Sequence, residues 1–309
     1  MALQEHTADL AEGAAEKFNA GKTIIEHVSN SSHEHPLIPL PTIGGIDFSV
    51  TKHVLMLWLV AGTVFVVVTW TVRRYLKQDR PIPSGFMNAL EAVVEYIRDS
   101  IVLPNVGKKW VNAWTPFILT LFVFILAANT VGLIPIFEVL GLLNHWVIHA
   151  SETSFIARVI HGASTPTGNF NVTAALATVT FFAIIVAGST AHGFVTHWKN
   201  LVPHGLAPLV YVILIPIEIM GMFVRPFALT MRLAANMTGG HIALLSVLSF
   251  VFLFAELTGR ALAGIGVGVV VVPMASLLSG LEVIVVLVQA YVFALLSAVF
   301  IGMAIHVHH

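Results

Sequence analysis

The apolar residues of this chain are arranged in long charge-free runs that short polar stretches separate. The first run, residues 54–72, approaches the ~20 residues that an α-helix needs to cross a bilayer, and the basic stretch RRYLKQDR (residues 73–80) follows it at once. Basic residues concentrate on the cytoplasmic side of a membrane. We therefore predict a first transmembrane helix over 54–72, which begins a membrane domain over 53–309 and leaves a polar N-terminal extension, residues 1–52, outside the cytoplasm.

The next segment, residues 86–104, alternates apolar and charged positions with helical spacing. Its apolar face comprises Leu90, Val93, Val94, Ile97 and Ile101, and its charged residues lie off that face (Glu91, Glu95, Arg98 and Asp99). A helix with one apolar and one charged face lies along a membrane surface. We predict an interfacial amphipathic helix here.

Two further runs, residues 110–137 and 171–198, are each long enough to cross the membrane. The intervening residues 138–169 contain Trp146, Arg158 and several histidines, which is typical of a loop. Lys108 and Lys109 keep the start of this region cytoplasmic. The pattern predicts a transmembrane hairpin with an external loop.

From about residue 206 to the C-terminus the sequence is almost continuously apolar. This length fits four perpendicular spans or two long tilted helices. The charged pair Glu256 and Arg260 marks the natural turn. We predict two long helices, residues 206–256 and 261–307.

Composition agrees with a membrane location. Hydrophobic residues make up 57% of the 309 residues and charged residues only 10%, against about 25% in soluble domains, and the mean hydropathy is +0.89. The net charge of −1 gives no basic field for nucleic acid. The absence of cysteine excludes disulfides, thiol catalysis and cysteine–zinc sites. The fold class predicted is an all-α integral membrane protein.

Three charges in the first long helix, Glu218, Arg225 and Arg232, follow one another at intervals of seven, and Asn236 lies one turn further. A charge at bilayer depth costs at least ~2.5 kcal/mol, so such residues face a cavity, a partner or an ion path. Glu218 and Arg225 could form a structural ion pair. Arg232 has no acid within two turns of its own helix and cannot lose its proton, so its counter-charge must come from another segment or another subunit.

The last segment adds Glu282 and Gln289, again seven residues apart. An antiparallel pairing of the two long helices can place Arg232 level with Gln289, and His241 level with Glu282. A histidine–carboxylate pair inside a membrane is a candidate proton relay. The alternative is a hydrogen-bonded pair that only holds two helices together.

The stretch MRLAANMTGGH (residues 231–241) resembles the signature of subunit a of the F-type ATP synthase, which carries an essential arginine in an R-L-x-x-N-M core. The resemblance runs from about Val54 to the end of the chain. It includes Glu218, the N-x-x-x-L-x-P pattern from Asn129 to Pro135, and the L-x-Q-A-[YF] pattern around Gln289.

The resemblance implies a role for each of these residues. Arg232 would face a ring of c subunits, separate two proton half-channels and force ring carboxylates to release protons, with Asn236 and Gln289 beside it. The remaining proton-path residues would be Glu218, His241, Glu282 and Asn129. Two departures are that some members exchange the types at His241 and Glu282, and that Gly132 replaces an acidic residue.

The resemblance also implies the setting of the chain. Its partners would be the c-ring, b-type peripheral stalk subunits, lipid and protons, with no cofactor and no metal. It would lie in a bacterial plasma membrane with its N-terminus outside and its C-terminus in the cytoplasm. The chain has no G-x-x-x-x-G-K-[ST] loop, so it would carry no nucleotide chemistry itself.

Other interpretations are weaker. An independent ion-coupled transporter or channel would be expected to show internal repeats with broken helices, and we find none. A membrane enzyme would need a base beside Ser276 or Ser279, and no histidine shares that stretch. His33 and His35 lack the spacing of a structural metal site. His241 favours protons over sodium as the transported ion.

Overall fold

The structure is a computed structural model, and it describes residues 21, 24–25, 40–43, 46–47, 49–77, 83–133, 165–199 and 208–306. Most of the predicted N-terminal extension, the loop up to residue 164 and the last three residues lie outside this part of the chain. By contact density the chain forms two compact units. The first unit contains Met1–Ser29 and Gly239–Leu281, and the second contains Asn30–Thr238 and Glu282–His309.

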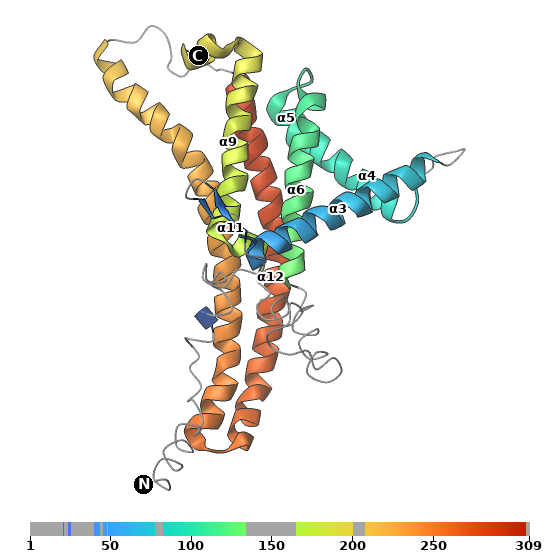
Figure 1. Ribbon diagram of the computed structural model, residues 1–309, viewed down its shortest axis with the longest axis vertical. Coiled ribbons are helices and arrows are strands. Elements are labelled where there is room, and N and C mark those ends of the chain that lie inside the picture. The colour runs from blue at the N-terminus through green and yellow to red at the C-terminus, as the bar shows by residue number, and fades with distance from the viewer. Residues whose placement is uncertain are drawn as a thin grey trace. The chain divides into compact units, whose positions relative to one another are not determined.

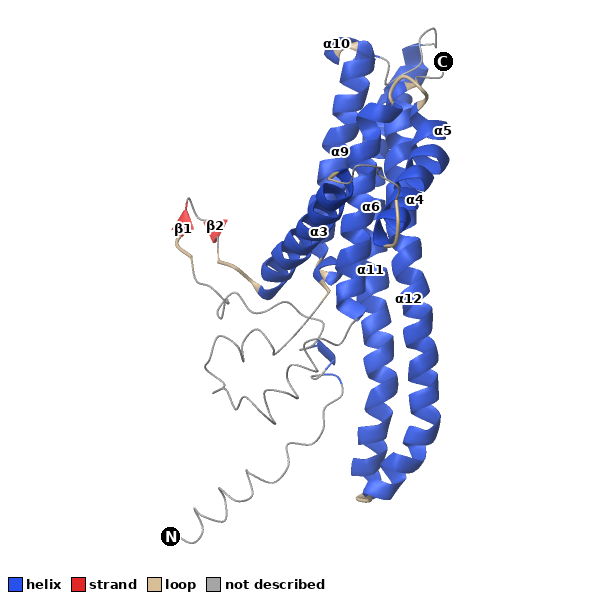
Figure 2. Cartoon of the chain, turned by 90° about the vertical axis from the view of Figure 1, so that its right-hand side faces the viewer, coloured by secondary structure: helices blue, strands red, loops and turns tan. Residues whose placement is uncertain are grey.

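Five described helices are long and apolar enough to cross a membrane: His53–Leu76, Val111–Leu133, Phe170–His192, Val210–Thr258 and Leu262–Ile305. Inside hydrocarbon the backbone can find hydrogen-bond partners only in itself, and a helix satisfies every such group within one segment. These helices confirm the all-α membrane class. The exception in the described residues is a pair of two-residue antiparallel strands, β1 (Thr42–Ile43) and β2 (Ile46–Asp47) (Figure 2).

The first long helix, α3, spans Lys52–Leu76 and carries Arg73 and Arg74 in its last turn. It crosses α6 (Val111–Leu133) at a large angle (Figure 1). The predicted amphipathic segment is one continuous helical stretch made of α4 (Phe86–Tyr96), a π-helical part η1 (Ile97–Val102) and α5 (Leu103–Val106).

The apolar face predicted for that segment is used for packing inside the protein. Ile97 and Ile101 have no exposed surface, whereas Arg98 and Asp99 are exposed and form an ion pair at 2.8 Å. Val102, which the helical pattern did not mark, is also fully buried, because the wider π-helical turn brings Ile97, Ile101 and Val102 to one side.

The span expected over 171–198 is divided into α9 (Phe170–His192) and a short helix α10 (Phe194–Lys199). The break is at Gly193, whose φ of +87° favours glycine. A 3₁₀ turn, η3 (Pro166–Gly168), precedes α9, and the side chain of Asn169 caps the helix by accepting from the backbone N–H of Asn171 at 2.8 Å.

The two long C-terminal helices are α11 (Pro208–Thr258) and α12 (Ala261–Ile305). In the first unit they form a hairpin, and its turn is visible at the end of both helices in Figure 1. Gly259, with φ +59°, makes the turn. Gly264 allows the helices to approach, because a Cβ there would lie 2.9 Å from the carbonyl oxygen of Val251.

The core of the second unit joins η1, α5, α6, α9, α11 and α12 in one cluster of buried side chains. Among the α12 residues that face this core is a row of small residues four apart: Ala290, Ala294 and Ala298 have no exposed surface, and Gly302 continues the row. Small residues at this spacing let helices pack closely in membranes. At Gly302 the approach is to backbone, since a Cβ would lie 2.3 Å from the carbonyl oxygen of Asn105.

Histidines tie the C-terminal end of α12 to its neighbours. The Nε2 of His192 lies 2.8 Å from the carbonyl oxygen of Ile305, and the Nε2 of His306 lies 3.1 Å from that of Val106. A carbonyl oxygen can only accept, so both rings donate through Nε2. The ring of His197 fills the space beside Gly188, where a Cβ would lie within 2.1 Å of its Nδ1.

We expect Gly302→Ala to destabilise the protein by about 1–3 kcal/mol, because the added methyl group collides with backbone that cannot rotate away. The matched control is Gly280→Ala on the same helix, where a Cβ would meet nothing within 4 Å. Thermal unfolding of the detergent-solubilised variants measures both. Equal transition temperatures would show that α12 does not approach α5 this closely.

Burial lowers the pKa of the His197 imidazole, and the neighbouring His192 lowers it further. The folded state therefore disfavours protonated His197. The stabilisation that comes from keeping this imidazole neutral is complete above the unfolded pKa of about 6.5. The free energy of unfolding decreases as the pH falls below that value. We expect the protein to unfold more readily at pH 5 than at pH 7.5, and His197→Gln to reduce this difference. An unchanged pH dependence in melting experiments would exclude His197 as its source.

Candidate functional site

The polar residues of α11 in the second unit lie on a face that turns gradually along the helix. Glu218 and Arg225 are half-buried, while Arg232 and Asn236 are exposed. Seven residues in a straight helix fall about 20° short of two full turns, so the later members of the row are displaced sideways from the earlier ones.

Arg225 contacts an aromatic ring. Its guanidinium carbon lies 5.6 Å from the centre of the Phe300 ring on α12, a cation–π arrangement. The ion pairs of the described residues include neither Arg225 nor Glu218. The ion-pair interpretation of these two residues is therefore not supported in this structure.

Arg232 is positioned through its main chain. The side-chain amide of Gln289, only 3% exposed, donates from Nε2 to the carbonyl oxygen of Arg232 at 2.9 Å. This bond confirms that Arg232 and Gln289 are level on the two helices. Leu229 and Leu233, which are 2% and 1% exposed, bury the adjacent face of α11, so this face fixes the rotation of the helix.

The guanidinium of Arg232, by contrast, is directed to the outside of the chain. The residue is exposed and takes part in no ion pair of the described residues. Large apolar side chains surround it on the exposed surface of α11, including Val224, Phe227 and Met231, and the small residues Ala228 and Ala235 are exposed there too. A permanent charge therefore stands on an apolar surface.

Glu282 and His241 belong to different units. Glu282, in the second unit, is buried with 7% of its surface exposed. His241, in the first unit, is half-buried. Their pairing as a proton relay stays a prediction.

Asn129 lies in a polar cluster that the sequence did not predict. Its side chain is fully buried on α6, and its Oδ1 accepts a hydrogen bond from the hydroxyl of Thr167 in η3. The hydroxyl of Thr238 on α11 donates to the carbonyl oxygen of Gly168 at 3.2 Å. The turn η3 therefore links α6 to α11 just beyond Asn236.

The same turn explains the glycine that departs from the family pattern. A Cβ at Gly132 would lie within 1.9 Å of the Thr165 hydroxyl, and Thr165 is itself 2% exposed. No side chain fits at position 132 while Thr165 occupies this place. The only signal in the sequence was the polar stretch TPTGN directly before an apolar span.

The described residues contain no group of three or more histidine, aspartate or glutamate side chains that could hold a metal ion. His33 and His35 lie outside the described part of the chain.

We expect Thr167→Val to destabilise the protein by ~1–3 kcal/mol, because it leaves the buried Oδ1 of Asn129 without its donor. Thr178→Val is the matched control, since the exposed Thr178 hydroxyl bonds only to the carbonyl of Ala174 on its own helix. Denaturant or thermal unfolding in detergent compares the two. Equal losses would mean that the Asn129 cluster adds nothing to stability.

Known proteins resemble this chain over most of its length. The family model described as ATP synthase A chain matches residues 54–302. The ATP synthase subunit a 2 of Chlorobium luteolum is 38% identical over 298 residues, which cover 94% of this chain and 77% of that protein. The ATP synthase subunit a of Myxococcus xanthus is 38% identical over 267 residues, 86% of this chain and 76% of that protein.

A third relative, the ATP synthase subunit a of Chloroherpeton thalassium, is 34% identical over 296 residues, which cover 94% of this chain and 77% of that protein. The matched region of the family model includes all five long apolar helices apart from the ends of the first and last. This extent goes well beyond the MRLAANMTGGH stretch. The chain belongs to the ATP synthase A chain family.

Proposed function

We propose that this chain is the a subunit of a proton-translocating F-type ATP synthase, in which it provides two offset half-channels beside a ring of c subunits. The observation that carries the proposal is Arg232, an exposed guanidinium on an apolar helix surface with no ion pair among the described residues. Such a charge needs a carboxylate from outside its own chain. A carboxylate on a passing ring subunit meets that need in turn for each subunit.

The mechanism follows from the cost of charge in lipid. A protonated ring carboxyl is neutral and can face hydrocarbon, whereas an ionised one cannot. A proton that arrives through one half-channel neutralises the carboxylate and lets the ring turn. Near Arg232 the ionised form is favoured again, and the proton leaves through the other half-channel.

Arg232 also separates the two half-channels. A proton that passed directly from one to the other would have to approach a fixed positive charge at low dielectric, which repels it. The membrane potential supplies about 2.3 kcal/mol per charge per 100 mV to bias the direction of rotation. The hydrogen bond from Gln289 supports this role, because it holds the backbone of Arg232 in place.

The remaining polar residues serve as the proton path. Asn236 and Gln289 lie beside the arginine, Glu218 lies further along α11, and Glu282 is a buried carboxyl on α12. Asn129 belongs to the polar cluster with Thr167. His241 completes the path on α11.

The surface that would meet the ring is apolar, and glycines leave parts of it without side chains. Within α11 and α12 a Cβ at Gly221, Gly239, Gly266, Gly268 or Gly280 would meet nothing within 4 Å. Glycine inside a helix costs about 1 kcal/mol relative to alanine, and close approach of a helix from another subunit accounts for it.

The setting follows from the same reasoning. The N-terminus lies outside and the C-terminus in the cytoplasm, and two observations support this orientation: the five candidate spans of the described residues are odd in number, and Arg73 and Arg74 follow the first of them. The membrane is a bacterial plasma membrane. The partners are the c-ring and b-type peripheral stalk subunits, and the chain acts without a cofactor and without nucleotide chemistry of its own.

The decisive test is Arg232→Ala in vesicles that contain the whole membrane sector. We expect ATP-driven proton pumping to fall by more than about tenfold, since tenfold corresponds to only ~1.4 kcal/mol and a charge at bilayer depth involves at least ~2.5 kcal/mol. Passive proton flux is followed in parallel. Arg232→Lys tests whether charge alone suffices.

The matched control is Arg225→Gln, which removes a guanidinium from the same helix but one that lies against Phe300. We expect it to retain coupling. Full coupling in Arg232→Ala would refute the proposal. Proton flux through this chain alone, without other subunits, would instead identify an independent channel.

A further inference from the structure

A cavity of about 610 Å³ lies among α3, α4 and α6, away from the polar residues of α11 and α12. Its wall is almost entirely apolar and includes Val64, Val68, Leu90, Val94 and Val123. The volume is in the range of ~300–1,000 Å³ typical of pockets for small ligands. The proposed proton path uses none of these residues.

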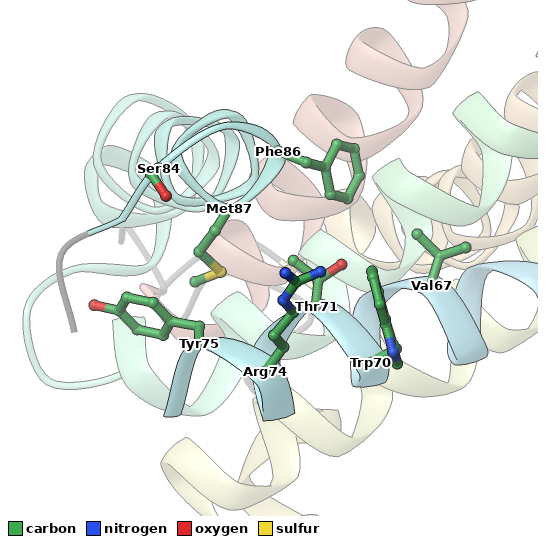
Figure 3. Close-up of a pocket in the computed structure, with 8 residues that line it drawn as sticks. All are labelled: Val67, Trp70, Thr71, Arg74, Tyr75, Ser84, Phe86 and Met87. Atoms are coloured by element: carbon green, nitrogen blue, oxygen red, sulfur yellow. The ribbon is translucent and has the colours of Figure 1, made fainter. Parts of the chain in front are cut away.

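A second hollow, about 460 Å³, adjoins the first and shares Met87 with it. Figure 3 shows it at the end of α3, where Arg74 extends toward Met87 and Ser84, and Trp70 lies beside it. One end of this region is therefore apolar, and the other presents a guanidinium and a hydroxyl group.

Three basic residues gather at this end of α3, and within the described part of the chain no ion pair neutralises them. Arg73, Arg74 and Lys77 line a third hollow of about 440 Å³ beside the other two, and the ion pairs of the described residues include none of them. The Arg74 guanidinium carbon lies 5.4 Å from the centre of the Trp70 ring, which leaves its donors available to an anion. The first turn of α4 adds backbone donors, because Gly85 provides no side-chain cap.

A second observation concerns a polar group in the wall of the apolar cavity. Glu91 lines it, and the Oε2 of its carboxyl group is buried with no hydrogen-bond partner in the described structure. A buried acceptor without a donor is costly. A ligand that carries a hydroxyl group would supply that donor.

We propose that an anionic phospholipid with a hydroxyl-bearing head group, of the phosphatidylglycerol class, binds between α3 and α4. Its phosphate contacts Arg74, Ser84 and the first turn of α4. A head-group hydroxyl donates to Glu91, and the acyl chains fill the cavity among α3, α4 and α6. The net charge of the lipid complements the basic end, as expected for basic clusters beside a membrane helix.

The site would have a structural consequence. Residues 77–85 connect α3 to α4 along the chain. The contact between α3 and α4 is less extensive than the contact between α3 and α6. A lipid held by side chains from both helices would fix the angle between them. This inference is independent of the proposed proton path.

The test is retention of 1-palmitoyl-2-oleoyl-phosphatidylglycerol by the purified intact complex, measured by native mass spectrometry and by lipid extraction. We expect Arg74→Gln to lower the affinity about fivefold, the effect typical of one basic residue at a membrane surface. The matched control is Lys109→Gln. Lys109 also holds a cation over a tryptophan, at 5.2 Å from the Trp110 ring, but lines none of the three hollows.

A second pair of variants tests the apolar part without changing charge. Val68→Phe fills the cavity and should also lower retention, whereas Thr63→Phe adds the same ring at an exposed position outside it. A photoactivatable acyl chain on the same lipid should label α3, α4 and α6.

Three outcomes would overturn the proposal. One is equal retention in Arg74→Gln and Lys109→Gln. Another is equal binding of phosphatidylcholine, which would remove the role of the basic end. The third is cross-linking of the cavity residues to another subunit in place of lipid, which would assign the cavity to a protein partner.

Discussion

Hydrocarbon offers a polypeptide backbone no hydrogen-bond partner, and most of this fold follows from that constraint. Every long apolar run is helical because a helix satisfies its own N–H and C=O groups. The four described glycines with positive φ, at positions 85, 107, 193 and 259, each mark the end or the beginning of a helix. Glycine adopts this backbone conformation without a steric penalty, so it can end a helix within one residue.

Four prolines lie within the long helices of the described residues. Proline removes one backbone donor and disturbs the turn before it. Two of the four prolines within long helices are followed four residues later by threonine, and the hydroxyls of Thr120 and Thr230 donate to the carbonyl oxygens of Pro116 and Pro226. These bonds add a second donor to the carbonyl oxygen of each proline, whereas the carbonyl oxygens that lose a donor are those of residues 112 and 222, four residues earlier.

In the second unit α12 has two faces with different tasks. One face carries Ala290, Ala294 and Ala298 into the core, where they let the neighbouring helices approach. On the other face, large apolar residues such as Ile284 and Leu287 are exposed and are not part of the core. Gln289 lies at 3% exposure between these faces and holds the backbone of Arg232, so the charge on α11 is positioned by the helix that forms the core.

The sequence alone determined the membrane class and the long apolar helices, and it predicted a role for Arg232, because run length, charge cost and spacing are local properties of the chain. It also placed Arg232 level with Gln289, since two antiparallel helices with a fixed turn leave little choice of register.

It did not predict the break at Gly193, which divides one expected span, because an apolar run does not show where its helix bends. The cluster of Asn129, Thr167 and Thr238, the cavity above Glu91, and the lack of an ion pair between Glu218 and Arg225 were decided by the tertiary structure. Each depends on which helix faces contact one another across distant parts of the chain, and hydrophobicity does not specify such contacts when nearly every face is apolar.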